Sequence, residues 1–370
     1  MCVLSLQRAC APRIPIFAPV PIQRHPIEEF LTLCKDALLF DVRSPGEYEH
    51  AQLPGAVSLP LFTNEERALV GTAYKQVSRE HAIKIGLDAF GPKMRNMVET
   101  VERAAKSRGL DSTAPVYLYC WRGGMRSGAV AWLLGLYGFD VHVLDGGYKA
   151  FRNWVLEQFT LAYPFRVLGG YTGSGKTELL HLLKAAGELV IDLEGLAGHK
   201  GSAFGNIGMP AQPSQELFEN LLALQLDAAR SRLTADGSRL WLEDESQRIG
   251  QRHIPHALWP QLLAAPISFV DIPFEARLRH IVEEYGVLDR ERLRDAIGRI
   301  SKRLGGLETK MALQHLDAGD LTACFAILLR YYDKLYLKGL HGRQDLEGRL
   351  QTISVTDVTP ENVHAILSAL

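Results

Sequence analysis

One stretch of the chain, residues 170–177 with the sequence GYTGSGKT, has the residue types and spacing that bind phosphate groups. It matches the G-x-x-x-x-G-K-[ST] phosphate loop at every position. The glycines of such a loop let backbone amides turn toward phosphate oxygens, and the start of the following helix adds partial positive charge. Lys176 would reach the outer phosphates, and the Thr177 hydroxyl would reach a magnesium ion. The residues predicted to bind phosphate are Gly170, Gly173, Ser174, Gly175, Lys176 and Thr177.

The flanking segments predict the elements that would position this loop. Residues 164–169 form an apolar run that predicts a buried strand, and residues 177–186 have the apolar spacing of a helix. Another apolar strand, predicted within 239–246, ends in acidic residues. Glu243 or Asp244 could therefore lie on the magnesium side of the site, or these acids could form a solvated turn.

A glycine-rich segment, residues 195–208, carries three polar side chains that could reach a bound ligand. These are His199, Lys200 and Ser202. The composition predicts a mobile loop that closes over the phosphate site, and a plain surface loop is the alternative.

A second candidate for chemistry is Cys120, which follows the apolar strand predicted at 116–119. It precedes a helix, and Arg122 and Arg126 lie close to it in sequence; all of these features favour the nucleophilic thiolate. The alternative is a small buried apolar residue. The other cysteines have no comparable setting; they are Cys2, Cys10, Cys34 and Cys324.

The region around Cys120 resembles the rhodanese (sulfurtransferase) family. The resemblance rests on four segments: residues 39–48, 53–57, 120–127 and 143–147. It implies that Cys120 carries a transferable sulfur as a persulfide, and that Asp41 and Arg43 brace the fold and the rim of the active site. Two features depart from common thiosulfate sulfurtransferases. The cysteine loop is one residue longer, and a charged helical insert is predicted at 61–113.

The order of predicted strands and helices indicates an α/β protein with parallel sheets. We expect an N-terminal rhodanese-like α/β domain, followed by a P-loop NTPase-like parallel α/β domain with C-terminal helices. The predicted parts are an N-terminal arm (1–24), the rhodanese-like domain (25–147), a helical connector (148–163), the P-loop domain core (164–273) and a mainly helical C-terminal part (274–370).

Composition and charge limit the class of protein. The 41 basic and 42 acidic residues nearly cancel, so any nucleic-acid surface must be local. The C-terminal helices carry the candidate tRNA-binding residues Arg292, Arg294, Arg299, Lys302 and Arg303, although such a run is also typical of a solvated helix face. No apolar stretch could span a bilayer, the proline-rich N-terminus predicts no export signal, and the five scattered cysteines lack metal-ligand spacing. These features predict a cytoplasmic protein without a metal centre of its own.

A reactive cysteine and a phosphate loop on one chain resemble the bacterial tRNA 2-selenouridine synthases. Further segments that carry the resemblance are residues 41–47, 70–75, 199–205 and 243–246. The resemblance implies an enzyme that replaces the sulfur of wobble 2-thiouridine in tRNA with selenium from selenophosphate. It also implies an S-geranylated intermediate made from geranyl diphosphate.

The same resemblance implies roles for the residues above. Cys120 would handle selenium or the leaving sulfur, with Arg122 and Arg126 holding anionic groups, and the loop ending in Lys176 and Thr177 would hold a diphosphate. It implies that selenophosphate and geranyl diphosphate act as co-substrates and that no cofactor is tightly bound, although Mg²⁺ could take part. The implied partners are tRNA and an enzyme that supplies selenophosphate, and no membrane is involved. Two other classes stay open: an ATP-dependent sulfurtransferase or kinase, and a non-catalytic tRNA-binding module.

Overall fold

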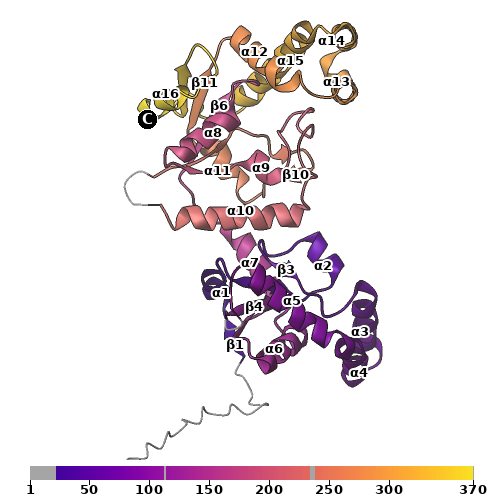
Figure 1. Cartoon of the computed structure of the whole chain (residues 1–370). Coiled ribbons are helices and arrows are strands. Elements are labelled where there is room, and N and C mark those ends of the chain that lie inside the picture. Colours follow the sequence, from indigo (N-terminus) through magenta and orange to yellow (C-terminus); the bar gives the residue numbers. More distant parts are fainter. Residues whose placement is uncertain (1–21, 112–113, 234–237, 370) are drawn as a thin grey trace, which may run out of the picture. The chain divides into compact units, whose positions relative to one another are not determined.

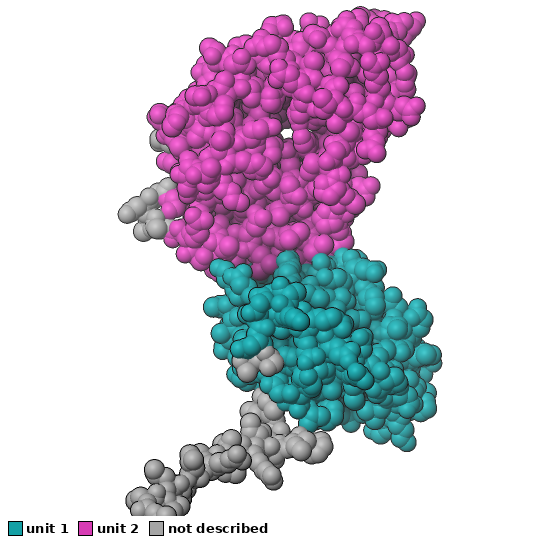
Figure 2. All heavy atoms as spheres, in the orientation of Figure 1, with its two compact units in different colours: residues 1–154 teal, residues 155–370 magenta. Residues whose placement is uncertain are grey.

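The computed structural model describes residues 22–111, 114–233 and 238–369. The chain divides into two compact units, Met1–Trp154 and Val155–Leu370, which Figure 2 colours separately. Most of the predicted N-terminal arm lies outside the described residues. The described part of the chain contains no helix that is long and apolar enough to cross a membrane.

The first unit is built on a five-stranded parallel sheet with the strand order β1-β5-β4-β2-β3. The central strands are buried and apolar, as expected when helices cover both faces of a parallel sheet. Their carboxyl ends meet at one edge of the sheet, which is where ligands usually bind in α/β proteins. The strands are β1 (Gln23–His25), β2 (Leu38–Asp41), β3 (Val57–Ser58), β4 (Val116–Tyr119) and β5 (Val141–Leu144).

Helices fill the connections of this sheet, and the predicted insert is indeed helical (Figure 1). Thr63 begins the insert with a capping box in which Glu66 bonds back to the Thr63 amide. The amphipathic helix α5 buries Met97, Val98 and Val101 in the core of the unit. The helices are α1 (Ile27–Leu33), α2 (Pro45–His50), α3 (Asn64–Gln76), α4 (Arg79–Phe90), the 3₁₀ turn η1 (Gly91–Lys93), α5 (Met94–Ser107), α6 (Met125–Tyr137) and α7 (Gly147–Gln158).

The second unit has a parallel sheet with the order β12-β11-β6-β8-β7. The strand that precedes the phosphate loop, β6, lies in the middle, and β8, which ends in acids, is its direct neighbour. The chain order of the strands does not follow their order in the sheet, so β6 lies beside a topological switch point. The strands are β6 (Phe165–Gly170), β7 (Leu189–Val190), β8 (Leu240–Glu243), β11 (Ile267–Asp271) and β12 (Leu350–Ser354).

Two apolar clusters stabilise this unit. One lies between the sheet and the helices α8 and α16, and the other is formed mainly by helices α12 to α15 and includes Phe204 from the glycine-rich loop. Figure 1 shows α12 to α15 gathered at one end of the unit. The helices are α8 (Lys176–Ala185), α9 (Leu193–Ala197), α10 (Gln215–Arg230), α11 (Trp259–Ala264), α12 (Phe274–Tyr285), α13 (Arg290–Leu304), α14 (Gly306–Ala318), α15 (Leu321–His341) and α16 (Asn362–Ser368).

The predicted α/β class with parallel sheets is confirmed, but some local details differ. The strand after α8 is short and ends at Val190, because Asp192 caps a new helix through the Gly195 amide. Glu194 therefore lies in the first turn of α9. A short antiparallel pair, β9 (Arg248–Ile249) with β10 (Arg252–His253), was not predicted from the sequence.

Candidate active sites

The phosphate loop connects the buried strand β6 to the amino end of α8. Lys176 donates a hydrogen bond to the Gly170 carbonyl oxygen at 3.0 Å. Gly173 has a φ of +82°, and a Cβ there would lie 2.7 Å from the Ile281 side chain, so both conformation and space require glycine. Ser174 is fully buried, and its hydroxyl has no hydrogen-bond partner among the described residues. A buried, unused hydroxyl within such a loop fits the binding of an anionic oxygen.

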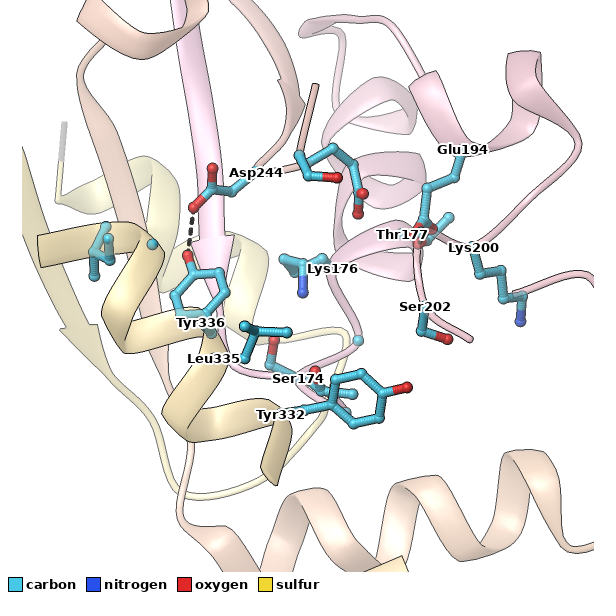
Figure 3. A pocket seen from close by; sticks show the side chains of 18 of the residues that line it. Ser174, Lys176, Thr177, Glu194, Lys200, Ser202, Asp244, Tyr332, Leu335 and Tyr336 are labelled. Atoms are coloured by element: carbon cyan, nitrogen blue, oxygen red, sulfur yellow. Dashed lines mark hydrogen bonds between the residues drawn. The ribbon is translucent and has the colours of Figure 1, made fainter. Parts of the chain in front are cut away.

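The acidic side chain that contacts Thr177 is Glu194. The Thr177 hydroxyl donates to Glu194 Oε2 at 2.9 Å (Figure 3). Burial raises the pKa of Glu194, although Lys176 and the Thr177 bond oppose this shift. Burial and repulsion from Glu194 raise the pKa of Glu245 well above its ordinary value. Glu194 and Glu245 were not among the residues predicted from the sequence, and both line the pocket at the phosphate loop.

The two predicted acids have other contacts. Asp244 accepts hydrogen bonds from Tyr336 at 2.5 Å and from Arg343, and the Tyr336 hydroxyl also accepts a bond from the Gly170 amide. Glu243 is buried behind the site, where it accepts from the Leu193 amide. Burial and the nearby Asp192 raise the pKa of Glu243 well above its usual range. Asp244 thus fastens α15 to the base of the loop, and Glu243 helps position α9.

This acid cluster makes a prediction for stability. A carboxyl group whose pKa is raised on folding keeps its proton longer in the folded than in the unfolded chain, so stability falls as pH rises above the unfolded pKa. We expect hydrogen-exchange protection of β8 to fall between pH 5 and pH 8. In Glu245→Gln the fall should be smaller, because the amide stays neutral over this pH range. The exposed Glu283→Gln on α12 serves as control, and an equal pH dependence in all three proteins would contradict the prediction.

Above the loop lies a pocket of about 470 Å³ with walls of two kinds. The phosphate loop, Glu194, Glu245 and Lys200 form the polar side. Figure 3 shows Tyr332, Leu335 and Tyr336 along α15 near Lys176. The other large apolar or aromatic lining residues are Trp259, Leu263, Ile281, Tyr285 and Leu340. The pocket therefore suits a molecule with an anionic end and an apolar end.

The glycine-rich loop contributes two of its three predicted side chains to this pocket. Lys200 and Ser202 line it, and Lys200 forms an ion pair with Glu284 of α12. His199 does not line the pocket; burial and the charge of Arg299 lower its pKa. Two hydrogen bonds at Ala203 anchor the loop. The Ala203 amide donates to the Tyr332 hydroxyl at 3.4 Å, and the Arg299 guanidinium donates to the Ala203 carbonyl oxygen at 2.8 Å. Closure of the loop over a ligand stays a prediction.

In the first unit, Cys120 lies at the carboxyl end of β4, just before helix α6. Its side chain is almost buried, with 3% of the residue exposed, and Sγ lies 3.3 Å from the Ser127 hydroxyl. The Ser127 hydroxyl donates to the Gly124 carbonyl oxygen at 3.2 Å, so in this arrangement it can accept from the Cys120 thiol, and rotation of the hydroxyl would let it donate to a thiolate. The Cys120 carbonyl accepts from the Tyr148 amide at 2.8 Å, which fastens the loop to the start of α7. Burial raises the pKa of Cys34 and of Cys324 to about 11.

The cysteine loop depends on a glycine in the facing turn. Gly147 has a φ of +61°, and a Cβ there would lie 2.3 Å from the Cys120 carbonyl oxygen. We expect Gly147→Ala to displace the loop and to destabilise the first unit by about 1–3 kcal/mol, measured by hydrogen exchange of β4. Gly128→Ala in α6 is the matched control, since a Cβ there meets nothing within 4 Å. Equal protection of β4 in the two variants would contradict this role of Gly147.

Of the charged residues discussed near Cys120, Arg122 is exposed to solvent and the others form ion pairs. Arg126 donates to Glu47 Oε2 at 2.8 Å. Burial opposes the charge of Glu47, but the hydrogen bond and charge of Arg126, the Ser44 amide and the charge of Arg67 together outweigh burial and lower the pKa of Glu47. Arg43 and Asp41 form a fully buried ion pair, and the Arg43 guanidinium lies 3.8 Å from the centre of the Tyr148 ring. The Arg43 guanidinium also donates to the Ala51 carbonyl oxygen at 2.7 Å, so the pair braces the chain segments around it, and a role of the pair in catalysis stays a prediction.

The candidate tRNA-binding residues all lie on α13, and their contacts differ. Arg294 pairs with Asp317, and Arg299 bonds to the Ala203 carbonyl. Arg292, Lys302 and Arg303 are exposed and make no ion pair within the described ranges. These three could contact a phosphate backbone, and the structure does not test this prediction.

The fold and the two sites together define a rhodanese-like domain fused to a phosphate-loop domain. A family model described as a rhodanese-like domain matches residues 27–153, and one described as the tRNA 2-selenouridine synthase AAA domain matches residues 163–354. A tRNA 2-selenouridine synthase of Cronobacter sakazakii is 34% identical over 355 residues, which cover 87% of this chain and 90% of the relative. The chain belongs to the tRNA 2-selenouridine synthase family, and the prediction of an enzyme of this type is confirmed.

The chain is also similar to a solved structure of a single domain. It is the N-terminal domain of a Clostridium difficile protein described as an ATP/GTP-binding protein, with 40% identity. The match covers 36% of this chain and 99% of that domain, with a TM-score of 0.33.

Proposed function

We propose that this enzyme replaces the sulfur of wobble 2-thiouridine in tRNA with selenium from selenophosphate, through an S-geranylated intermediate made from geranyl diphosphate. Membership of the family supports a tRNA substrate. The observation that carries the choice of geranyl donor is the two-sided pocket of the second unit. Its phosphate loop suits a diphosphate, and its aromatic and aliphatic wall suits an isoprenoid tail.

In the first step the thiocarbonyl sulfur attacks C1 of the geranyl group. The C1–O bond breaks, diphosphate leaves with the bonding electrons, and the base loses its N3 proton. The loop amides, Lys176 and Ser174 would stabilise the charge that grows on the leaving diphosphate. The tyrosines on the apolar wall would hold the tail and keep water from the reacting carbon.

A magnesium ion fits the oxygen donors beside the loop. Thr177, Glu194 and Glu245 supply hydroxyl and carboxylate oxygens, which are the ligand types that Mg²⁺ prefers. Within the described residues no cluster of three or more acidic, histidine or cysteine side chains could hold a metal ion alone, so diphosphate oxygens would complete the site. When bound, Mg²⁺ would neutralise diphosphate charge and so improve the leaving group.

The second step is assigned to the first unit and to Cys120. Selenium in selenophosphate is already fully reduced, so making a perselenide on the cysteine would need an oxidant. A balanced route is displacement at C2 of the base. The Cys120 thiolate forms a C–S bond as geranylthiolate leaves, the selenium of selenophosphate then displaces the cysteine, and hydrolysis of the Se–P bond releases phosphate.

The decisive experiment incubates the protein with a wobble-thiolated tRNA and follows the wobble nucleoside by mass spectrometry. Geranyl diphosphate alone should give the S-geranyl nucleoside, and selenophosphate together with it should give 2-selenouridine. No change in the base, with ATP hydrolysed in the presence of tRNA, would overturn the proposal in favour of a nucleotide-driven enzyme.

A further inference from the structure

A second, much smaller cavity continues from the pocket of the second unit. Its volume is about 20 Å³, and it shares Thr172, Ser202, Ile281, Tyr285 and Tyr332 with the larger pocket. The remaining lining residues lie only here: Phe204, Phe325, Leu328 and Leu329. The two cavities therefore form one path that begins at the phosphate loop and ends among apolar side chains of α15.

Two hydroxyl groups at the small cavity already accept hydrogen bonds from the glycine-rich loop. The Tyr332 hydroxyl accepts from the Ala203 amide at 3.4 Å, and the Ser202 hydroxyl accepts from the Phe204 amide at 3.2 Å. The space that remains is bounded by rings and leucine methyl groups, where a water molecule would lack partners. Its size corresponds to roughly one water-sized or methyl-sized group.

The end of this path is closed by packed aromatic rings. Phe204 contacts Tyr285, Phe325 and Tyr332 edge to face, with ring centroids 6.1, 6.4 and 6.5 Å apart. Leu328 and Phe325 are nearly fully buried. Because a close-packed interior resists the insertion of extra methylene groups, this wall should act as a fixed stop.

We infer that this small cavity holds the far end of the isoprenoid tail and sets the length of the prenyl group that the enzyme transfers. The inference rests on the proposed function, since the phosphate loop must fix the diphosphate at the other end of the path. A donor one isoprene unit longer would press against Phe204, Phe325 and Leu328. A donor one unit shorter would leave the cavity empty and lose its apolar contacts.

The test changes one side chain at the stop in both directions. Leu328→Ala removes bulk from the wall, and Leu328→Phe adds bulk. Each protein is assayed with thiolated tRNA and with dimethylallyl, geranyl or farnesyl diphosphate, and kcat/KM is measured from the prenylated nucleoside. In Leu328→Ala the farnesyl-to-geranyl ratio should rise roughly tenfold or more, and in Leu328→Phe the dimethylallyl-to-geranyl ratio should rise similarly.

Ratios between donors separate selectivity from folding defects, because a partly unfolded variant loses activity with all donors alike. Leu316→Ala is the matched control: Leu316 is equally buried in the same helical cluster and lines neither cavity. Unchanged ratios in both Leu328 variants, or an equal change in Leu316→Ala, would overturn the inference while the geranyl assignment stands. A wild-type enzyme that uses no prenyl diphosphate would overturn both.

Discussion

Replacing Lys176 with alanine should strongly slow geranyl transfer to tRNA while leaving the selenium step intact. Lys176 extends from the first turn of α8 into the pocket, and its ammonium now bonds to the Gly170 carbonyl of its own loop. On diphosphate binding it would move to phosphate oxygens that gain charge as the C–O bond breaks. The loss of such a group costs roughly 100- to 1,000-fold in rate. We therefore expect a fall of that size in the rate of geranylation, measured by nucleoside mass spectrometry.

The matched control for Lys176 lies on the same helix. Lys184 is an exposed lysine in the last turn of α8 and does not line the pocket. Lys184→Ala should keep full geranylation and diphosphate affinity. Lys176→Ala given geranylated tRNA and selenophosphate should still form 2-selenouridine, because the diphosphate is no longer needed. Normal geranylation by Lys176→Ala would show that the donor binds elsewhere.

The parts of these sites that are contiguous in sequence could be predicted without the structure. The loop from Gly170 to Thr177 carries its whole chemical pattern within eight residues, and both flanking elements were expected. The same holds for Cys120, where a strand, a glycine turn and a helix follow one another. Such local patterns fix the backbone geometry by themselves.

The parts that depend on contacts distant in sequence could not be predicted in the same way. Glu194 reaches Thr177 because a new helix begins after Asp192, and no local pattern in the sequence indicates this contact. The apolar wall combines side chains of α11, α12 and α15, and Tyr336 of α15 contacts a loop that lies 166 residues earlier in the chain. Helical periodicity assigns such tyrosines to a core, and only the packing of α15 shows that they border a pocket.

The two acids predicted beside magnesium illustrate a further limit. β8 ends at Glu243, and Asp244 and Glu245 follow it directly, so successive acidic side chains can point in different directions. The sequence shows three candidates but not which neighbour each will meet. Asp244 meets Tyr336 and Arg343, and Glu245 shares the pocket with Glu194. The role of each acidic side chain depends on which residues it contacts, and these contacts are set by the tertiary fold.

Replacing Cys120 with serine should have the opposite effect from Lys176→Ala: geranylated tRNA should accumulate, and 2-selenouridine should not form. A serine hydroxyl is far less nucleophilic than a thiolate at neutral pH, so displacement at C2 should slow by on the order of a thousandfold. The measurement supplies tRNA geranylated beforehand, with selenophosphate, and follows both nucleosides. Cys324→Ser is the control, because that thiol is buried in the helical cluster of the second unit.

The covalent route also predicts a species that can be seen directly. When selenophosphate is omitted, wild-type protein and geranylated tRNA should release geranylthiol and leave a protein–tRNA adduct at Cys120 that survives denaturing electrophoresis. Cys120→Ser should form no such adduct, whereas Cys324→Ser should form as much as the wild type. If Cys120→Ser makes selenouridine at the normal rate, selenium attacks C2 without the cysteine. The geometry of the loop, with Ser127 beside Sγ and Gly147 against the Cys120 carbonyl, would then serve only to bind an anion.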